Sequence, residues 1–155
     1  REARSNIGMI FQHFNLIPRR TVMTNVLSGT LSKTGVIKSI FGIYSEEDKK
    51  KAQDYIKIVG LEGKENVRAD NLSGGQQQRV AVARSLASKP KFILADEPTA
   101  NLDSKSTAKL LDIMSRLNKQ EKITFVFSTH DQRVIDRARR VVTLEDGKII
   151  KDIKK

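Results

Sequence analysis

The 155 residues are enough for one domain with a hydrophobic core and too few to make two domains the expectation. Hydrophobic residues make up 38% and charged residues 30%, which is typical of a globular protein. The sequence has no cysteine, no secretion-signal pattern and no apolar run near the roughly 20 residues of a membrane span. We therefore expect a cytosolic protein without disulfides. The net charge of +11 would attract phosphates, nucleic acid or an anionic membrane, but basic residues are scattered and only 5% of residues are aromatic, which disfavours a nucleic-acid surface.

The chain begins with a predicted strand and a short helix. NIGMIF (6–11) is expected to be a buried strand that runs into polar Gln12. A loop follows, and either Thr21 or Thr24 is expected to cap a short helix through VLSGTL. GVIKSIFGIY (35–44) is apolar but interrupted by glycine, and we expect it to be irregular or weakly helical.

Two longer helices are expected next. Ser45 precedes three acidic residues that suit the positive end of a helix dipole, and Gly60 is expected to end that helix. Its inward stripe is Ala52, Tyr55, Ile56 and Val59. Ser73 begins a second helix that runs to Pro90, with inward positions at Val80, Ala83, Leu86 and Ala87.

The second half of the chain alternates strands and helices. FILA (92–95) is an unbroken apolar run, typical of a strand covered on both faces, and ITFVFS (123–128) is predicted to be a second buried strand. Between them a helix over about 104–119 carries its apolar stripe at Leu110, Ile113, Met114 and Leu117. A short helix near 132–139 follows, and the Asp-Gly pair at 146–147 predicts a hairpin between two final strands.

These elements define an α/β fold. Strand, helix, strand over the second half is a βαβ unit, which places both strands in a parallel sheet. A helical stretch over about 20–88 is inserted between the first strand and the rest of the sheet. We therefore expect a parallel sheet core, an inserted helical subdomain and a C-terminal β-hairpin.

The segment from Ser73 to Gln76 is a candidate anion site. Gly74 and Gly75 leave the first backbone N–H groups of a helix unobstructed, and these groups together with the helix dipole favour a phosphate. A plain serine-capped helix is the alternative.

Polar side chains also follow three of the predicted strands. Asp96 and Glu97 end the FILA strand, at the carboxyl edge where open α/β sheets bind ligands, and two adjacent acids favour Mg²⁺ or solvent. His130 follows the next strand and is expected at the same edge. Gln12 follows the first strand, where its amide is either a ligand to a metal or water, or an ordinary loop residue.

Taken together these residues resemble the ABC ATPase family. LSGGQQQRVAVARSLASKPKFILADEPTANLD (72–103) is similar to its signature motif, Walker B strand and D-loop. Gln12 in IFQHFNLIP resembles the Q-loop, and His130 in FSTHD resembles the switch histidine. The resemblance implies a P-loop NTPase-like core divided into a Q-loop strand and loop (1–19), a helical subdomain with the signature motif (20–88), and the Walker B to switch-histidine core with its hairpin (89–155).

The resemblance also implies a function and a role for each motif residue. The protein would be the ATP-hydrolysing subunit of a membrane transporter, bound to a permease at the cytoplasmic face of the membrane and paired with a second nucleotide-binding domain. Asp96 would hold Mg²⁺ through water, Glu97 would be the general base, and His130 would contact the γ-phosphate of ATP. Gln12 would touch Mg²⁺ and the water and sense the membrane domain. The other subunit's ATP would be gripped by Ser73, Gly74, Gly75 and Gln76, and Asp103 would couple the two sites.

One part of the family pattern has no match in these 155 residues. No G-x-x-x-x-G-K-[ST] phosphate loop occurs, since the Gly-Lys pairs at 63–64 and 147–148 lack the flanking residues. We therefore expect a C-terminal part of a longer polypeptide, poorly active alone and with an apolar sheet edge or face laid bare.

The resemblance leaves the subfamily and two other functions open. SGTLSKTGVIKSIFGIYSEEDKKKA (28–52) resembles phosphonate-importer ATPases, whereas ADEPTANLDSKST (95–107) and the segment THDQRVIDRARRVVTLEDGKI (129–149) are closer to lipoprotein-release and macrolide-export types. Two alternative functions are an ABC-type ATPase of DNA maintenance and a truncated, non-catalytic interaction module. The first is disfavoured because the sequence between Gln12 and Ser73 contains no long coiled coil.

Overall fold

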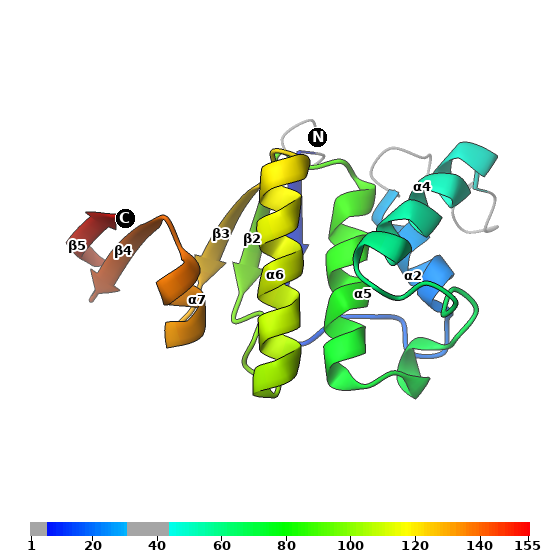
Figure 1. Ribbon diagram of the computed structural model, residues 1–155, viewed down its shortest axis with the longest axis horizontal. Helices are drawn as coiled ribbons and strands as arrows, with labels where there is room; N and C mark the ends of the chain where they lie inside the picture. The colour runs from blue at the N-terminus through cyan, green and yellow to red at the C-terminus, as the bar shows by residue number, and fades with distance from the viewer. Residues whose placement is uncertain (1–5, 31–43) are drawn as a thin grey trace.

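The computed structural model describes residues 6–30 and 44–155. In chain order the elements are β1 (Ile7–Ile10), α2 (Val22–Leu27), η1 (Ser28–Thr30), α4 (Glu46–Ile58), η2 (Ala69–Asn71), α5 (Gly74–Ala87), β2 (Phe92–Asp96), α6 (Ser104–Gln120), β3 (Thr124–Ser128), α7 (Gln132–Arg137), β4 (Arg140–Glu145) and β5 (Lys148–Lys154) (Figure 1). The expectation for 35–44 lies outside the described residues, apart from Tyr44. Within the described ranges no helix has the length and apolar character to cross a membrane.

A three-stranded parallel sheet forms the centre of the fold, in the order β1-β2-β3. Ile7 of β1 pairs with Phe92 of β2, which in turn pairs with Thr124 of β3. Helix α6 connects β2 to β3, so the predicted βαβ unit is confirmed. Helices α5 and α6 lie side by side in front of the sheet in Figure 1.

The prediction that the strand FILA (92–95) is covered on both faces is wrong for the described residues. Burial alternates along β1 and β2, because successive side chains of a strand point to opposite faces. Ile10, Ile93 and Ala95 are buried beneath α5 and α6. The other face is 38–49% exposed at Ile7, Met9, Phe92, Leu94 and Val126. Helices of the described segments therefore cover one face only.

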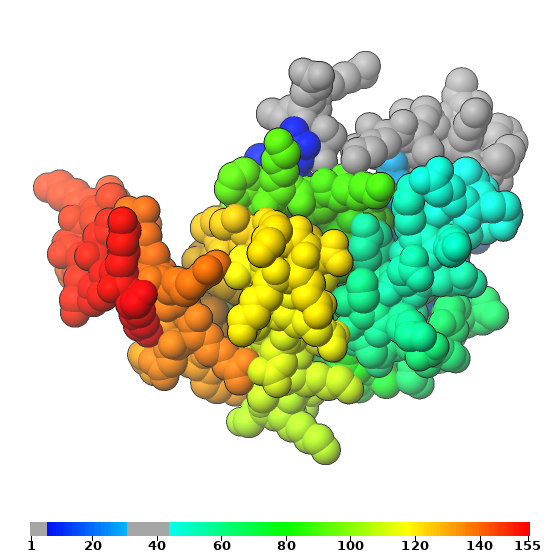
Figure 2. Space-filling view, turned by 45° about the horizontal axis from the view of Figure 1, so that its top comes forward, coloured from blue at the N-terminus to red at the C-terminus, as the bar shows by residue number. Residues whose placement is uncertain are grey.

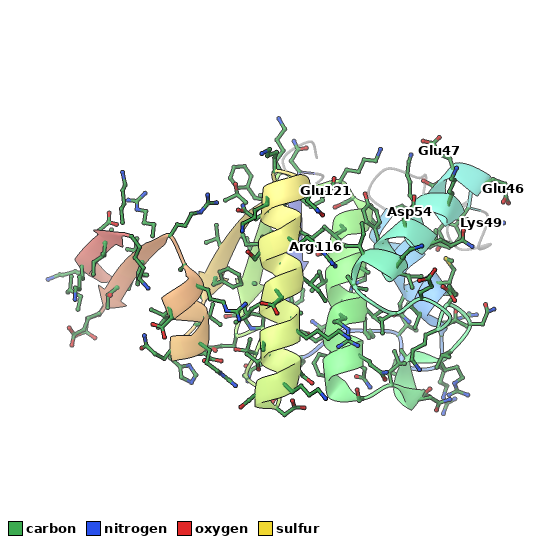
Figure 3. All side chains as sticks on the ribbon, in the orientation of Figure 1. Glu46, Glu47, Lys49, Asp54, Arg116 and Glu121 are labelled. Atoms are coloured by element: carbon green, nitrogen blue, oxygen red, sulfur yellow. The ribbon has the colours of Figure 1, made fainter. Side chains whose placement is uncertain are left out.

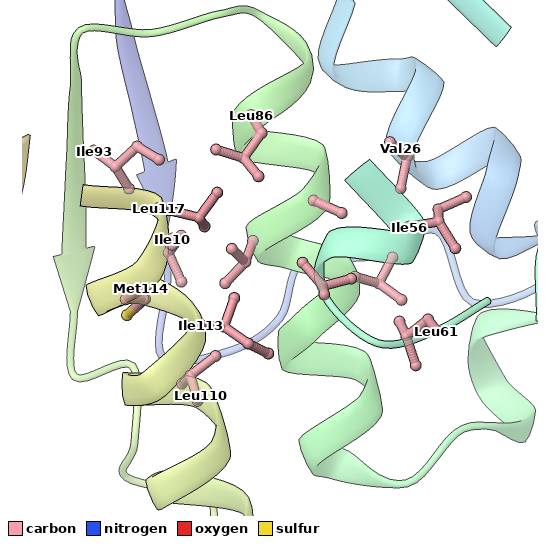
Figure 4. Packing of buried hydrophobic residues seen from close by; sticks show 14 of the residues in the cluster. Ile10, Val26, Ile56, Leu61, Leu86, Ile93, Leu110, Ile113, Met114 and Leu117 are labelled. Carbon is pink, nitrogen blue, oxygen red and sulfur yellow. The ribbon is translucent and has the colours of Figure 1, made fainter. Parts of the chain in front are cut away.

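The hydrophobic core lies between the sheet and the helices, and α5 is its central element. Ile10, Ile93 and Leu117 pack on the sheet side of α5, whereas Val26 and Ile56 pack on the side formed by α2 and α4 (Figure 4). The predicted stripe of α6 is confirmed, with Leu110, Ile113, Met114 and Leu117 all buried. On α4, Ala52, Ile56 and Val59 are buried and Tyr55 is partly buried.

Most predicted caps and turns are confirmed. Thr21 rather than Thr24 caps α2, through a 3.2 Å bond from the Thr24 N–H, and Ser45 caps α4. Gly60 adopts a positive φ of 69° at the end of α4. Asp146 and Gly147 both have positive φ, as a type I′ hairpin turn requires. The hairpin β4–β5 projects from the body of the molecule (Figure 2).

Polar contacts at the surface act within one helix and between two. Near the start of α4, Lys49 forms an ion pair with Glu46 at 2.7 Å (Figure 3). Arg116 of α6 donates a 2.5 Å hydrogen bond to the carbonyl oxygen of Ile58, which satisfies an otherwise unpaired carbonyl at the end of α4. This bond connects the end of α4 to α6 of the βαβ unit.

Candidate functional site

The carboxyl ends of the three parallel strands meet at one edge of the sheet. The arrowheads of β1, β2 and β3 point to this edge in Figure 1. Asp96 is the last residue of β2 and Glu97 follows it, whereas Gln12 and His130 follow the ends of β1 and β3. The predicted placement of these four residues at one edge therefore follows from the observed topology.

Glu97 and His130 are in direct contact. The Glu97 Oε1 atom lies 2.7 Å from His130 Nδ1 and accepts a 3.2 Å bond from the His130 backbone N–H. We assign a proton to Nδ1 in this contact, because an ionised carboxylate can only accept hydrogen bonds, and Nε2 then lies on the far side of the ring. The His130 side chain is 89% exposed and that of Glu97 21% exposed. The imidazole can therefore reach a ligand while it stays bound to Glu97.

The backbone of Glu97 is held in an uncommon conformation. Its φ is +42°, in the left-handed region that side chains with a Cβ atom rarely adopt. The Glu97 N–H donates a 2.9 Å hydrogen bond to the Ser128 carbonyl oxygen at the end of β3. This bond extends the pairing of the two strands by one residue and fixes the direction in which the Glu97 side chain leaves the sheet.

Asp96 and Gln12 have exposed side chains that are open to a ligand. Neither side chain has a hydrogen bond or an ion pair with the residues that the structure describes. Gln12 is tied to the edge through its backbone, because the Asn101 side chain donates a 3.2 Å bond to its carbonyl oxygen. Arg84 of α5 donates to the carbonyl oxygens of Phe14 (3.0 Å) and Asn15, which anchors the loop after Gln12.

The Ser73 to Gln76 segment begins α5 with a capping box. Ser73 accepts from the Gln76 N–H, and the Gln76 side-chain oxygen accepts from the Ser73 N–H at 3.0 Å. The Gly74 and Gly75 N–H groups have no hydrogen bond within the described residues. A Cβ atom on Gly75 would lie 2.6 Å from Ser106 Oγ and 2.8 Å from Ser106 Cβ, so only glycine fits against the start of α6.

The loop between β2 and α6 is hydrogen-bonded to the N-terminal turns of two helices, α5 and α6. The buried Gln78 side chain of α5 donates a 2.8 Å hydrogen bond to the Pro98 carbonyl oxygen. Asp103 caps α6 through a 2.8 Å bond from the Ser106 N–H and also accepts from the Ser106 hydroxyl. These hydrogen bonds from Ser106 hold the pKa of the Asp103 carboxyl below its usual value.

Four residues at this edge were not singled out from the sequence. Thr129 donates a 3.0 Å hydrogen bond to Glu97 Oε2, and Thr99 donates a 2.6 Å bond to Asp131 Oδ2. The Arg133 guanidinium beside Asp131, helped by Thr99, holds the pKa of that carboxyl well below its usual range. The signal that could have found them is the run of hydrogen-bonding residues that flanks Glu97 and His130 in the sequence.

The donor set at the edge fits Mg²⁺ that is shared with a phosphate ligand. Among the described residues no three His, Cys, Asp or Glu side chains gather as a complete metal site. Mg²⁺ commonly binds through one or two carboxylates, several waters and the phosphates of a substrate. The open carboxylate of Asp96 supplies one such ligand. The residues present therefore suit a metal that is shared with a phosphate-bearing ligand.

These features define a class of protein: an α/β fold of the P-loop NTPase type, whose parallel sheet presents acids, an imidazole and an amide along one edge. The sequence profile described as ABC transporter matches residues 1–100. The chain belongs to this family.

Curated relatives and solved structures agree with this assignment. A phosphonates import ATP-binding protein PhnC of Bdellovibrio bacteriovorus is 43% identical over 151 residues, covering 97% of this chain and 58% of the relative. The protein of the same name in Staphylococcus aureus is 43% identical over 155 residues and is covered to 59%. The chain thus spans less than two thirds of the length of these relatives.

Solved structures of ABC cassettes share the fold. A dimeric bacterial ABC transporter cassette superposes with a TM-score of 0.80 at 40% identity, over 97% of this chain and 63% of that one. A post-hydrolysis state of that cassette bound to ADP and Pi has a TM-score of 0.78 at 40% identity, over 99% and 65% of the two chains. An inward-facing putative metal-chelate type ABC transporter has a TM-score of 0.85 at 28% identity, over 96% and 58%.

Proposed function

We propose that the full-length protein is the ATP-hydrolysing subunit of an ABC membrane transporter. The observation that carries this proposal is the Glu97–His130 pair, which lies beside the unpartnered Asp96 at the carboxyl edge of the sheet. Hydrolysis of ATP needs a base for the attacking water and positive or polar groups for the γ-phosphate, and this edge offers both.

Each residue at the edge has a role in the proposed reaction. Glu97 accepts the proton of the water whose oxygen attacks the γ-phosphorus, and ADP leaves with the oxygen that bridged the β- and γ-phosphates. To donate from Nε2 to the γ-phosphate while Nδ1 donates to Glu97, the His130 ring must carry a proton on both nitrogens, and in this proposal it does so when ATP is bound. Asp96, through water, and Gln12 would hold Mg²⁺, which supplies charge neutralisation on the phosphates.

The signature segment serves a second copy of the protein in this proposal. Ser73, Gly74, Gly75 and Gln76 would grip the γ-phosphate of the ATP on the partner, and Asp103 would couple the two sites. The free N–H groups of Gly74 and Gly75 and the positive end of the α5 dipole support an anion here. The dimeric cassettes among the similar structures support pairing of two such domains.

The transport partner and substrate are inferred from the relatives. We propose a permease that carries the substrate across the membrane and holds this subunit at the cytoplasmic face, with substrates of the phosphonate class because the curated relatives carry phosphonate-import names. DNA maintenance is a weaker candidate. Helix α6, with 17 residues the longest described helix, is too short for the long coiled coil that such ATPases contain.

The change Glu97→Gln in the full-length protein tests the proposal. An amide cannot take a proton from water, so kcat for ATP hydrolysis should fall by about 100-fold or more, the size of effect expected for a lost general base. Binding of Mg-ATP, measured by equilibrium titration, should persist because the phosphate contacts remain. Turnover like that of the unchanged protein would remove Glu97 as the base, and Glu62→Gln, on the exposed loop after α4, is the control for loss of one carboxylate.

A further inference from the structure

We propose that Thr129 is a positioning residue that aims the basic oxygen of Glu97. This inference rests on the proposed function and deepens it. It comes from the hydrogen bonds around the Glu97 carboxylate, which leave one direction open for a water molecule.

The carboxylate of Glu97 is held on three sides. Two oxygens offer about four lone-pair positions. Oε1 uses both of its positions on His130, through the backbone N–H at 3.2 Å and the protonated Nδ1 at 2.7 Å. Oε2 uses one position on the Thr129 hydroxyl at 3.0 Å. Within the described residues the remaining lone pair is therefore on Oε2, the oxygen that Thr129 holds.

The direction of the Thr129 hydroxyl is fixed by a second hydrogen bond. Its oxygen accepts from the Asp131 backbone N–H at 3.0 Å, and a carboxylate cannot donate to it. The hydroxyl proton must therefore point to Glu97 Oε2. Thr129 accepts from its own loop and donates to the base across 32 residues of sequence.

The loop that carries Thr129 is itself clamped to the loop that carries Glu97. Asp131 is 14% exposed and accepts a 2.6 Å bond from the hydroxyl of the buried Thr99. Arg133 binds both oxygens of the same carboxylate, at 2.9 Å to Oδ1 and 2.7 Å to Oδ2. The Thr99–Asp131 bond crosses between the two loops, and Arg133, two residues from Asp131, orients the carboxylate that accepts it.

The consequence for catalysis is geometric. A general base must point a free lone pair at the water that it deprotonates, and loss of that orientation lowers kcat without weakening substrate binding. The Thr129 hydroxyl donates its single proton to Glu97, so it has none left to donate to a phosphate oxygen. Its removal should therefore change kcat and leave KM for ATP unchanged.

The test compares Thr129→Val with Thr129→Ser in the full-length ATPase. Valine keeps the shape but removes the donor, and kcat should fall by about tenfold or more, as expected for loss of one hydrogen bond to a charged group. Serine restores the hydroxyl and should return kcat to within about threefold of the unchanged protein. Thr124→Val, the same change at an exposed position at the start of β3, is the matched control and should leave kcat unchanged.

The outcomes separate this inference from the proposed function. If Glu97→Gln stops turnover but Thr129→Val keeps kcat within about twofold, which is below the loss of one such bond, only the positioning role is overturned. A serine variant as slow as the valine variant would also overturn it. If Thr129→Val does not fold, Thr129→Cys decides, because a thiol is a weak donor. Its kcat should fall clearly below that of Thr129→Ser, and equality would contradict the inference.

Discussion

At the scale of single residues, a buried amide holds the loop that follows Gln12. Asn25, completely buried, donates to the carbonyl oxygens of Ile17, Arg20 and Thr21 and accepts from the Ile17 N–H at 2.7 Å. It holds the loop after Gln12 to α2 in the way that Arg84 holds it to α5. Buried polar groups are kept when such partners satisfy them.

The lowered pKa of Asp131 predicts that the free energy of unfolding depends on pH. Its pKa is lowered in the folded state, so the stabilisation is present above the unfolded value of about 3.9 and is lost as the pH falls toward the folded value. The change Asp131→Asn should therefore lower the free energy of unfolding by about 2 kcal/mol at pH 7. The difference between the two proteins should shrink as the pH falls below about 4.

Urea unfolding at several pH values measures this difference. Asp54→Asn is the control for loss of one charge, because Asp54 lies exposed on α4 (Figure 3) and has no hydrogen bond or ion pair with a described residue. A gap between Asp131→Asn and the unchanged protein that stays the same from pH 7 to pH 3 would rule out the proposed clamp.

At the scale of elements, α5 has two tasks. Its buried residues pack between the sheet and the helices α2 and α4, and its first turn presents the Gly74 and Gly75 N–H groups. Gly29 shows how close this packing is, because a Cβ atom there would lie 2.1 Å from the Arg84 carbonyl oxygen. The position of the signature segment is thus set by the whole length of α5.

A comparison of two serine caps, Ser45 of α4 and Ser73 of α5, distinguishes helix capping from contact with the nucleotide. Ser73→Ala and Ser45→Ala each remove a hydroxyl that accepts from the third helical N–H, and each should cost about 1 kcal/mol in thermal or urea unfolding. Only Ser73 belongs to the proposed nucleotide contact. Ser73→Ala should therefore also lower ATP turnover, whereas Ser45→Ala should not. Equal turnover in both variants would argue against a role of the Ser73 hydroxyl beyond capping.

At the scale of the whole molecule, one face of the sheet is apolar and open among the described residues. Ile7, Met9, Phe92, Leu94 and Val126 lie on it. Exposed patches of this kind bind apolar dyes and promote association. The sequence-based expectation that an apolar sheet face is laid bare agrees with this arrangement.

Dye binding by the 155-residue chain tests this face. Phe92→Ser combined with Val126→Thr removes two apolar side chains that are 48–49% exposed, so fluorescence of an apolar probe should fall roughly in proportion to the area removed. Ile93→Thr, on the covered face of the same strand, should instead destabilise the core and raise dye binding. Unchanged fluorescence in the double variant would place the dye elsewhere.

Much of the fold could be predicted because its signals are local. Helix caps at Ser45 and Ser73, the stripe of α6 and the Asp146-Gly147 turn each depend on residues within a few positions of one another. The motif residues at the sheet edge follow from the same reasoning, since parallel strands end together. Their roles in catalysis remain proposals.

What only the tertiary structure decided involves residues far apart in the chain. Thr21 and Thr24 are equal candidates by local chemistry, and the choice of Thr21 follows from pairing of Arg20 and Val22 with the segment 67–69. The bonds of Glu97 to Thr129 and of Thr99 to Asp131 each span 32 residues. An apolar run such as FILA shows that both faces of a strand are apolar, but the helices that pack on the sheet determine which face is covered. The sequence by itself determined the helices, strands and motif residues, because these depend on residues close to one another in the chain. The hydrogen bonds that orient Glu97 could be seen only in the folded sheet, because they join the loops that follow two separate strands.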